Sequence, residues 1–464
     1  MNVLLLVVDS LRMGALFRAT AGGPRTPFLE RLARETVFFR RAYAAECWTL
    51  PAHMSMFTGL LPSEHGAHFH TMAYTRRAPT LAEILGAVGH HTEVVTRNSL
   101  FDGTVPGATR GFAVNTRALA PMSQATNPFL LALALSKPRV RRLIRDSGFF
   151  HALQKGDEGF LRTLARLGLP ADELALDLTL ARLAELRRTR RPFFLFVNLY
   201  DVHAPYPPHP TSTFRPLDSW ESLVENVLAG LALPKISSHA YLRDDFRLSA
   251  ASRRALLARY HRAIELMDAK LERFLGAAEV DGLLDNTLVV VTSDHGEGFG
   301  EHGLYLHDAA VYETHLHVPL WIRHPDLTPH AIDEVVSTRD LFGLLRTAGL
   351  HGHAAATQGT ILDPSYRAAH PVALAEHFHY PHGTRIQPRF RQNLTAAITP
   401  RRKLVARGGM LETYDLARDP EERLPEVTSL GDFTDACRRD GVARPAAAAI
   451  AEHFDAHQGL RRAS

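Results

Sequence analysis

The segment Cys47–Gly59 gathers several side chains that could take part in catalysis. They are a thiol, hydroxyls and an imidazole: Cys47, Thr49, Ser55, Thr58 and His53. A thiol or hydroxyl becomes an effective nucleophile when a neighbouring base or a metal ion lowers its pKa. The choice among these residues therefore depends on what the rest of the chain places beside them.

Polar residues follow three apolar runs elsewhere in the chain. The runs are 3–8, 193–199 and 287–292, and the residues after them are Asp9, Asp201 with His203, and Asp294 with His295. Short runs rich in Leu and β-branched residues predict strands that are buried on both faces. If these strands are parallel neighbours, their carboxyl ends meet at one edge of the sheet, where open α/β sheets bind ligands. Asp9 taken alone could equally cap a helix.

Carboxylates and imidazoles at such an edge predict a divalent metal ion. Zn²⁺ or Mn²⁺ suits mixed oxygen and nitrogen ligands, whereas an all-oxygen set would suit Ca²⁺ or Mg²⁺. The ion would lower the pKa of a coordinated Thr or Ser hydroxyl and stabilise negative charge on a phosphoryl or sulfuryl group. A helix with Thr49 as its N-cap, stopped by Gly59, would also direct free N–H groups at an anion.

Strands and helices alternate along the rest of the chain. Further strands are predicted at 37–44, 93–96 and 318–322, and further helices at 26–33, 81–88 and about 257–274. This alternation predicts an α/β fold with a mainly parallel central sheet flanked by helices.

The pattern also divides the chain in two. We expect a catalytic domain over 1–365, with a helical insertion at about 118–190 and an irregular insertion at about 204–250. Short strands at 372–375, 394–398 and 403–406, followed by a helical tail, predict a smaller α+β subdomain over 366–464.

Composition excludes several classes of protein. The chain has 464 residues, of which 45% are hydrophobic and 22% charged, as in soluble globular proteins. A net charge of +4 without a basic-aromatic motif gives little support to nucleic-acid binding. The presence of 2 cysteines excludes a disulfide framework and suits a reducing compartment, so we expect a cytoplasmic protein. No apolar run is long enough to span a membrane, and a homo-oligomer remains an open alternative.

Short motifs in a consistent order extend over most of the chain. They lie at 2–9, 26–29, 55–66, 201–206, 292–303, 317–320 and 414–421. In this order and spacing they resemble the sulfatase family of the alkaline phosphatase superfamily. The resemblance implies an alkaline-phosphatase-like sandwich, a metal site at the strand ends and a nucleophile on the helix that follows the first αβ unit.

The resemblance also places Thr49 in the nucleophile position. Sulfatases of the family carry Cys-X-Pro-Ser-Arg, or a version that starts with Ser, and the first residue is oxidised to formylglycine. The matching frame is Thr49-Leu50-Pro51-Ala52-His53, and Thr cannot give formylglycine. Cys47 stands two residues too early and lacks the Pro of the motif, so we expect a small buried packing residue.

Other positions also depart from the family pattern. Ser10 stands where many sulfatases have a second acidic residue, His53 replaces the motif Arg, and His307 stands where a Lys is expected. Fewer carboxylates and more imidazoles favour a transition metal over Ca²⁺. Thr as the nucleophile resembles the phosphoryl-handling branches of the superfamily.

We therefore predict a role for each residue of the site. The predicted metal ligands are Asp9, Asp294 and His295, with Thr49 bridging the metal and the substrate. His203 could contact the substrate oxygens or protonate the leaving group, or simply form part of a turn. His307 could replace the family's Lys as an anion contact or general acid.

Residues with weaker predicted roles surround this set. The predicted substrate-binding residues are Ser10, Arg12, His53 and Asn98. We expect Asp201 to orient its turn and His302 to support the site from outside it. The superfamily's architecture suggests that histidines of the C-terminal part reach the pocket: His377, His379 and His382.

The leading hypothesis is a metal-dependent hydrolase of phosphate monoesters, phosphate diesters or phosphonate esters, acting on a small anionic substrate through a covalent Thr49 intermediate. The alternatives are a sulfatase that works without formylglycine, a soluble phosphoryl-group transferase, and a binding protein that keeps the fold without catalysis.

Overall fold

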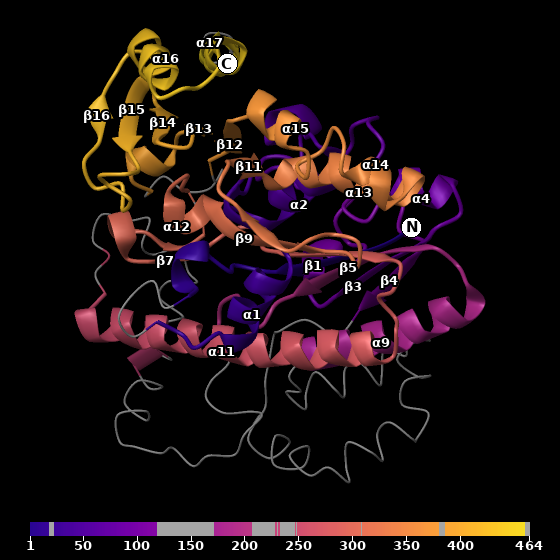
Figure 1. The fold of residues 1–464 in the computed structure, drawn as a ribbon. Helices are drawn as coiled ribbons and strands as arrows, with labels where there is room; N and C mark the ends of the chain where they lie inside the picture. Colours follow the sequence, from indigo (N-terminus) through magenta and orange to yellow (C-terminus); the bar gives the residue numbers. More distant parts are fainter. Residues whose placement is uncertain are drawn as a thin grey trace.

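The central feature of the computed structural model is a nine-stranded sheet with helices on both faces (Figure 1). The structure describes residues 1–17, 23–117, 171–206, 228–229, 231–232, 246, 248–307, 309–379 and 386–459. The strands follow the order β10-β2-β9-β6-β1-β5-β3-β4, and β11 pairs with β2. Their bounds are β1 Asn2–Val8, β2 Val37–Tyr43, β3 His91–Thr96, β4 Val114–Arg117, β5 Phe193–Leu199, β6 Thr287–Thr292, β9 His317–Arg323, β10 His330–Ile332 and β11 Val336–Ser337.

The three apolar runs that precede the polar residues form the middle of this sheet. Strand β1 lies between β5 and β6 and is parallel to both. Strand β9 is antiparallel to its neighbours β2 and β6, so the sheet is mixed but mainly parallel. The predicted α/β class and the central strands are therefore confirmed.

Each face of the sheet packs against its own hydrophobic core. Leu4, Leu6 and Val8 of β1 belong to one core, and Val3, Leu5 and Val7 belong to the other. This double burial explains why the strand is a continuous apolar run. Helices α1 (Pro27–Glu35), α9 (Ala171–Thr189) and α11 (Ala250–Val280) cover one face, and α2 (Thr49–Thr58), α4 (Leu81–Ala87) and α13 (Leu341–His351) cover the other (Figure 1).

Helix α1 is capped by a residue from a distant part of the sequence. Thr26 occupies the N-cap position, as the sequence predicts, but its side chain makes no capping bond. Asp268 of α11 accepts hydrogen bonds from the backbone N–H groups of Phe28 (3.1 Å) and Leu29 (2.8 Å) instead. These bonds satisfy donors that the start of a helix leaves without partners.

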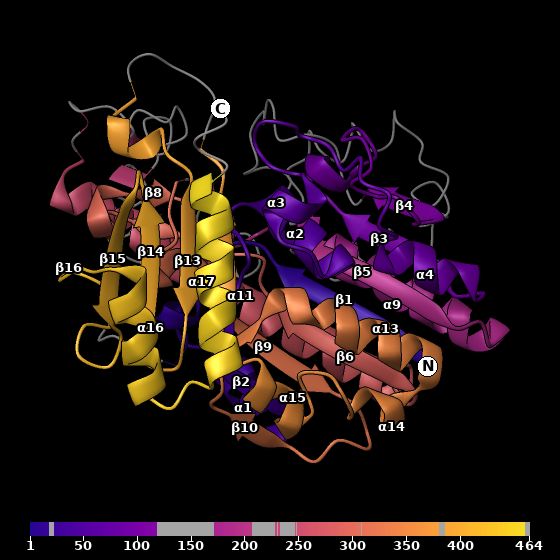
Figure 2. The same ribbon diagram turned by 90° about the horizontal axis from the view of Figure 1, so that it is seen from above.

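A second, antiparallel sheet forms the C-terminal part, as Figure 2 shows. Its strands are β12 Ala373–His377, β13 Leu394–Ile398, β14 Arg402–Arg407, β15 Met410–Asp415 and β16 Glu426–Val427. Helices α16 (Leu430–Arg439) and α17 (Arg444–Gly459) share a small core with it. The sequence predicts the first three of these strands and misses the last two.

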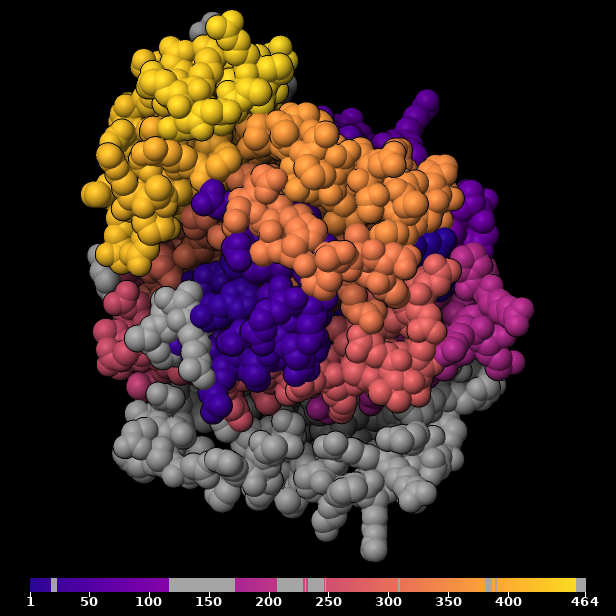
Figure 3. Space-filling model, in the orientation of Figure 1, coloured from indigo at the N-terminus to yellow at the C-terminus, as the bar shows by residue number. Residues whose placement is uncertain are grey.

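The last residues of the chain, coloured yellow in Figure 3, form one end of the molecule in this view. A buried ion pair joins the C-terminal sheet to the rest of the chain, because Lys403 of β14 lies 2.8 Å from Glu313 at the start of α12 (Glu313–Leu316). The smaller elements are α3 Pro62–His65, α14 His353–Ala356, α15 Pro364–Ala369, β7 Gly298–Phe299 and β8 Tyr305–Leu306.

The two predicted insertions fall largely outside the described residues. Residues 118–170 of the first are not described, whereas its final part is α9. Only isolated positions of the second are described between 207 and 247. Within the parts of the chain that the structure covers, no helix combines the length and apolar character needed to span a membrane.

Candidate active site

The polar residues after β1 and β6 converge on one point. The register pairs Val7 with Thr292, so Asp9 and Asp294, each two residues further on, lie side by side. Asp9, Asp294 and His295 each offer one ligand atom, and these atoms lie within 4.8 Å of one another. All three residues are fully buried. The predicted convergence is therefore present for the ends of β1 and β6, whereas Asp201 after β5 pairs with Lys270 and Arg97.

The donor set of this cluster fits a divalent cation. His295 donates its Nδ1–H to the carbonyl of Gly296 (2.9 Å), so its Nε2 is an acceptor. That nitrogen lies 3.3 Å from Asp294 Oδ2 and 3.8 Å from Asp9 Oδ1. Asp294 Oδ2 has no hydrogen-bond partner among the described residues. Acceptors that face one another in a buried site are satisfied by a metal ion.

Burial also perturbs both carboxyl groups. Desolvation raises the pKa of Asp294 to about 7. Desolvation, with the negative charge of Asp294, raises the pKa of Asp9 to about 6. Two buried carboxylates without a cation repel one another, and a bound metal removes that repulsion.

Thr49 places its hydroxyl against this cluster. Its Oγ1 lies 3.1 Å from His295 Nε2, and the residue is buried. The prediction that Thr49 is the N-cap of α2 is wrong, because Trp48 occupies that position and Thr49 is the first helical residue. The hydroxyl therefore contacts the cluster instead of capping its own helix. Gly59 ends the helix with φ of 72°, as predicted.

The other candidate nucleophiles have different partners. Ser55 Oγ lies 3.1 Å from His65 Nε2, and Thr58 donates to the carbonyl of Met54 (2.6 Å). Cys47 Sγ lies 3.5 Å from His377 Nδ1. These contacts support Thr49 as the hydroxyl that belongs to the cluster.

Ser10 and Asn98 hold the carboxylates in place. Ser10 Oγ donates to Asp9 Oδ1 (3.1 Å), and Ser10 N–H donates to Asp294 Oδ1 (3.2 Å). Asn98, which follows β3, donates its amide to Asp9 Oδ2 (3.2 Å). Their contacts therefore orient the predicted metal ligands, and substrate binding by either residue stays a prediction.

His53 and Arg12 lie next to the site with different partners. His53 Nδ1–H donates to the carbonyl of Thr49 (2.8 Å), and burial lowers the pKa of His53 to about 3, so the ring is neutral. Arg12 donates to Glu301 (2.8 Å) and to the carbonyl of Glu297 (3.0 Å). These bonds connect Arg12 to the 297–301 turn, and substrate binding by Arg12 stays a prediction.

His203 and His307 extend the imidazole cluster. The His307 ring stacks on His295 with centroids 4.3 Å apart, and the His203 and His307 rings are 4.9 Å apart. Glu297 accepts from His307 Nδ1 (3.2 Å), which fixes that ring. Burial lowers the pKa of His203, so it is neutral near pH 7. Both rings are therefore placed beside the cluster of Asp9, Asp294 and His295.

Glu297 is a residue of the site that sequence reasoning misses. It contacts His307 and also accepts a hydrogen bond from the hydroxyl of Tyr206 (2.9 Å). Its position two residues after His295, in a Gly-rich turn, is the sequence feature that indicates a place in the site.

The remaining predicted residues have other partners. Asp201 pairs with Lys270 and with Arg97 (2.8 Å), which agrees with its predicted turn-orienting role. His302 stacks on Tyr312.

The predicted C-terminal histidines do not join the described contacts of the cluster. His377 pairs with Glu46 (2.9 Å), and His379 with Asn393 (2.8 Å). His382 lies outside the described residues.

Two curated relatives match most of the chain. The chain is 26% identical over 344 residues to a choline-sulfatase of Rhizobium meliloti, covering 71% of this chain and 63% of that protein. It is 24% identical over 382 residues to the multifunctional alkaline phosphatase superfamily protein PehA of Trinickia caryophylli, covering 71% of this chain and 69% of that protein.

A solved structure shows the same fold over nearly the whole chain. The phosphonate monoester hydrolase of Agrobacterium radiobacter superimposes with a TM-score of 0.63 at 23% identity, covering 97% of this chain and 96% of that chain. The family model for sulfatases matches residues 1–349, which include every residue of the cluster. The chain therefore belongs to the sulfatase family, a family of ester hydrolases.

Proposed function

We propose that this protein is a metal-dependent hydrolase of phosphonate monoesters and phosphate esters that uses Thr49 as its nucleophile. One observation carries the proposal. A hydroxyl that cannot be converted to formylglycine stands at the first position of α2, with its oxygen 3.1 Å from His295 Nε2 in the buried cluster. The α/β frame and the sulfatase-family match support hydrolysis of an anionic ester.

Asp9, Asp294 and His295 would hold the ion, with Thr49 as a further ligand. Carboxylate oxygens with an imidazole nitrogen favour Zn²⁺ or Mn²⁺, and Ca²⁺ or Mg²⁺ are alternatives. The bound ion would lower the pKa of the Thr49 hydroxyl and stabilise negative charge on the substrate. Asn98 and Ser10 keep the two carboxylates in orientation.

The remaining steps use side chains of the cluster. Thr49 Oγ, its proton already lost to solvent, attacks phosphorus as the alkoxide; a bond between Thr49 Oγ and phosphorus forms, and the bond to the leaving oxygen breaks. His307, protonated beside the Glu297 carboxylate, gives a proton to that oxygen, so an alcohol leaves. A water molecule then attacks phosphorus, the Thr49 oxygen departs, and the histidine recovers its proton from the water. The N–H groups at the start of α2 would bind the non-bridging oxygens.

Sulfate-ester hydrolysis is the second candidate. The family match and the choline-sulfatase likeness favour it. Against it stands Thr49, because the sulfatases that use formylglycine need Cys or Ser at this place.

A panel of esters with one common leaving group tests the proposal. We would measure kcat/KM of metal-loaded protein for para-nitrophenyl esters of phenylphosphonate, phosphate and sulfate, together with bis-para-nitrophenyl phosphate. Because the leaving group is constant, differences report on the reacting centre. We expect a phosphorus ester to exceed the sulfate by at least about 100-fold, equivalent to about 2.7 kcal/mol of transition-state binding. Equal or faster cleavage of the sulfate would reverse the assignment.

A further inference from the structure

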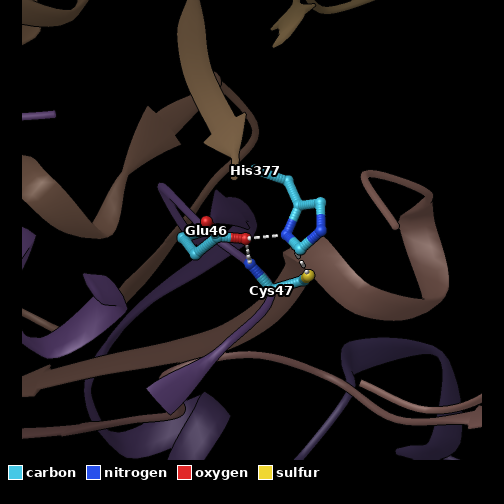
Figure 4. Close-up of side chains that lie close together, drawn as sticks. All are labelled: Glu46, Cys47 and His377. Atoms are coloured by element: carbon cyan, nitrogen blue, oxygen red, sulfur yellow. Dashed lines mark hydrogen bonds and ion pairs between the residues drawn. The ribbon is translucent and has the colours of Figure 1, made fainter. Parts of the chain in front are cut away.

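A second group of ligand-type side chains lies just before the nucleophile helix. Glu46, Cys47 and His377 each offer one ligand atom, and these atoms lie within 4.8 Å of one another (Figure 4). All three are buried, with exposed fractions of 1%, 0% and 1%. We propose that they form a structural Zn²⁺ site, separate from the active site.

The distances are compatible with one tetrahedral ion. Cys47 Sγ lies 3.5 Å and Glu46 Oε1 lies 2.9 Å from the same nitrogen, His377 Nδ1. Zinc bonds of about 2.0–2.3 Å give tetrahedral edges of about 3.3–3.6 Å. The distance from Cys47 Sγ to His377 Nδ1 already has that length. The distance from Glu46 Oε1 to His377 Nδ1 needs to increase by a few tenths of an ångström.

The shared nitrogen argues against a catalytic arrangement. In a Cys–His nucleophile the thiol and the orienting carboxylate contact opposite ring nitrogens. Here both contact Nδ1, and Cys47 has no exposed surface that a substrate could reach. Structural zinc sites are closed to solvent, whereas catalytic ones keep an open position, so the burial of all three ligands favours a structural ion.

Charge and unsatisfied hydrogen bonding also favour an ion. Glu46 Oε2 is buried and has no hydrogen-bond partner in the described parts of the chain. A carboxylate and a thiolate carry two negative charges, which Zn²⁺ neutralises while the imidazole stays neutral. Glu46 Oε2 or a water molecule completes the fourth position.

The ion would connect two parts of the fold. Glu46 and Cys47 lead directly into α2, whereas His377 ends β12 of the C-terminal sheet. The backbone already joins them, since Glu376 N–H donates to the carbonyl of Ala45 (2.9 Å). Zinc at this joint would fix the start of α2, where Thr49 lies, relative to the C-terminal sheet.

Zinc K-edge X-ray absorption on the zinc-loaded protein tests the proposal. The active-site cluster contains no sulfur, so a Zn–S distance shows zinc bound outside that cluster. We expect a sulfur contribution at about 2.3 Å in the wild-type spectrum. A wild-type protein that binds zinc with nitrogen and oxygen neighbours alone contradicts the proposal.

Variants identify which sulfur is bound. Cys437, the other cysteine, is buried in the small C-terminal core, so Cys437→Ala is the matched control and should keep the sulfur contribution. Cys47→Ser should lose it, and sulfur that persists in this variant contradicts the site. If Cys47→Ser fails to fold, the wild-type and Cys437→Ala spectra still decide the outcome.

A further variant separates this site from the proposed function. Asp294→Ala removes a ligand of the active-site cluster and none of the second site. We expect its zinc content to fall from about two to about one per chain, with a larger sulfur fraction in the spectrum of the remaining zinc. Loss of all sulfur-bound zinc in Asp294→Ala would mean that the two sites are not separate.

Discussion

At the scale of single residues, the active-site cluster contains more buried hydrogen-bond acceptors than donors. Asp9, Asp294 and His295 Nε2 face one another, and the Thr49 hydroxyl is the nearby donor. Ser10 and Asn98 donate to the two oxygens of Asp9, and the Ser10 N–H donates to Asp294 Oδ1. Asp294 Oδ2, which lies 3.3 Å from His295 Nε2, has no hydrogen-bond partner among the described residues. The proposed cation between these acceptors would offset the cost of burying them together.

The raised carboxyl pKa values predict a pH-dependent metal affinity. Binding needs both carboxylates ionised, and their pKa values are about 7 for Asp294 and about 6 for Asp9. Apparent affinity should be flat above about pH 7, fall up to about tenfold per unit below it, and fall more steeply below about pH 6. Burial lowers the pKa of His295 to about 4, so its protonation adds to the loss only in stronger acid.

Competition against a chelating indicator, corrected for its own protonation, measures this affinity. An affinity that stays constant from about pH 8 to about pH 6 would mean that neither carboxyl group has to lose a proton on binding.

Residue roles could be predicted from the sequence only where a residue lies at the end of a buried strand. Asp9, Asp294 and His295 lie at such ends, and the structure brings them together. Thr49 could be located only by its match to a family motif. The contacts of Arg12 with Glu301 and Glu297 depend on a turn almost three hundred residues away, which no local pattern specifies.

At the scale of elements, the start of a helix can depend on a side chain that is distant in sequence. Asp268 of α11 caps α1 through two backbone N–H groups, in the place of the Thr26 side chain. Local patterns predicted where α1 begins but not which residue satisfies its first donors.

Asp268→Ala should therefore lower the free energy of unfolding by about 1–2 kcal/mol, because two helix N–H groups lose their acceptor. Urea unfolding measures this change, and kcat should be unchanged.

The matched control for Asp268 is Glu272→Ala, which removes an exposed ion pair between α11 and Arg31 of α1. This control should change stability by less than about 1 kcal/mol. Equal effects of the two substitutions would show that the cap contributes no more than a surface charge pair.

At the scale of the whole molecule, buried charges connect the C-terminal sheet to the main sheet. Lys403 is fully buried and lies 2.8 Å from both Glu313 and Glu422. Burial alone would raise the pKa of Glu313, but the Lys403 ammonium outweighs it and lowers that pKa to about 2. The pair therefore stays ionised at the junction.

Lys403→Met should destabilise the protein by about 3–5 kcal/mol, because it removes the buried cation that lies between Glu313 and Glu422. Urea unfolding measures the change in the free energy of unfolding. Hydrogen exchange should show that backbone amides of the C-terminal sheet lose the most protection. Arg418→Met is the control, since that exposed side chain makes only a weak surface pair and should have an effect near zero. A Lys403→Met protein as stable as the control would mean that this pair does not join the two sheets.

The sequence predicts the α/β architecture and its central strands, but not every strand or the direction of each. Continuous apolar runs identify the central strands, because a strand needs apolar side chains on both faces only when both faces are buried. Strands β15 and β16 were missed, since half-exposed strands alternate with polar residues and resemble loops. The reversed direction of β9 could not be predicted either, because an apolar run carries no information about strand direction.

Turnover by Thr49→Ala and Thr49→Ser proteins of equal measured metal content tests the central claim most directly. If Thr49 is the nucleophile, Thr49→Ala should lose at least about 1000-fold in kcat for the best phosphorus ester, and Thr49→Ser, which keeps a hydroxyl, should retain most of it. A metal-loaded Thr49→Ala protein with wild-type kcat would contradict the account.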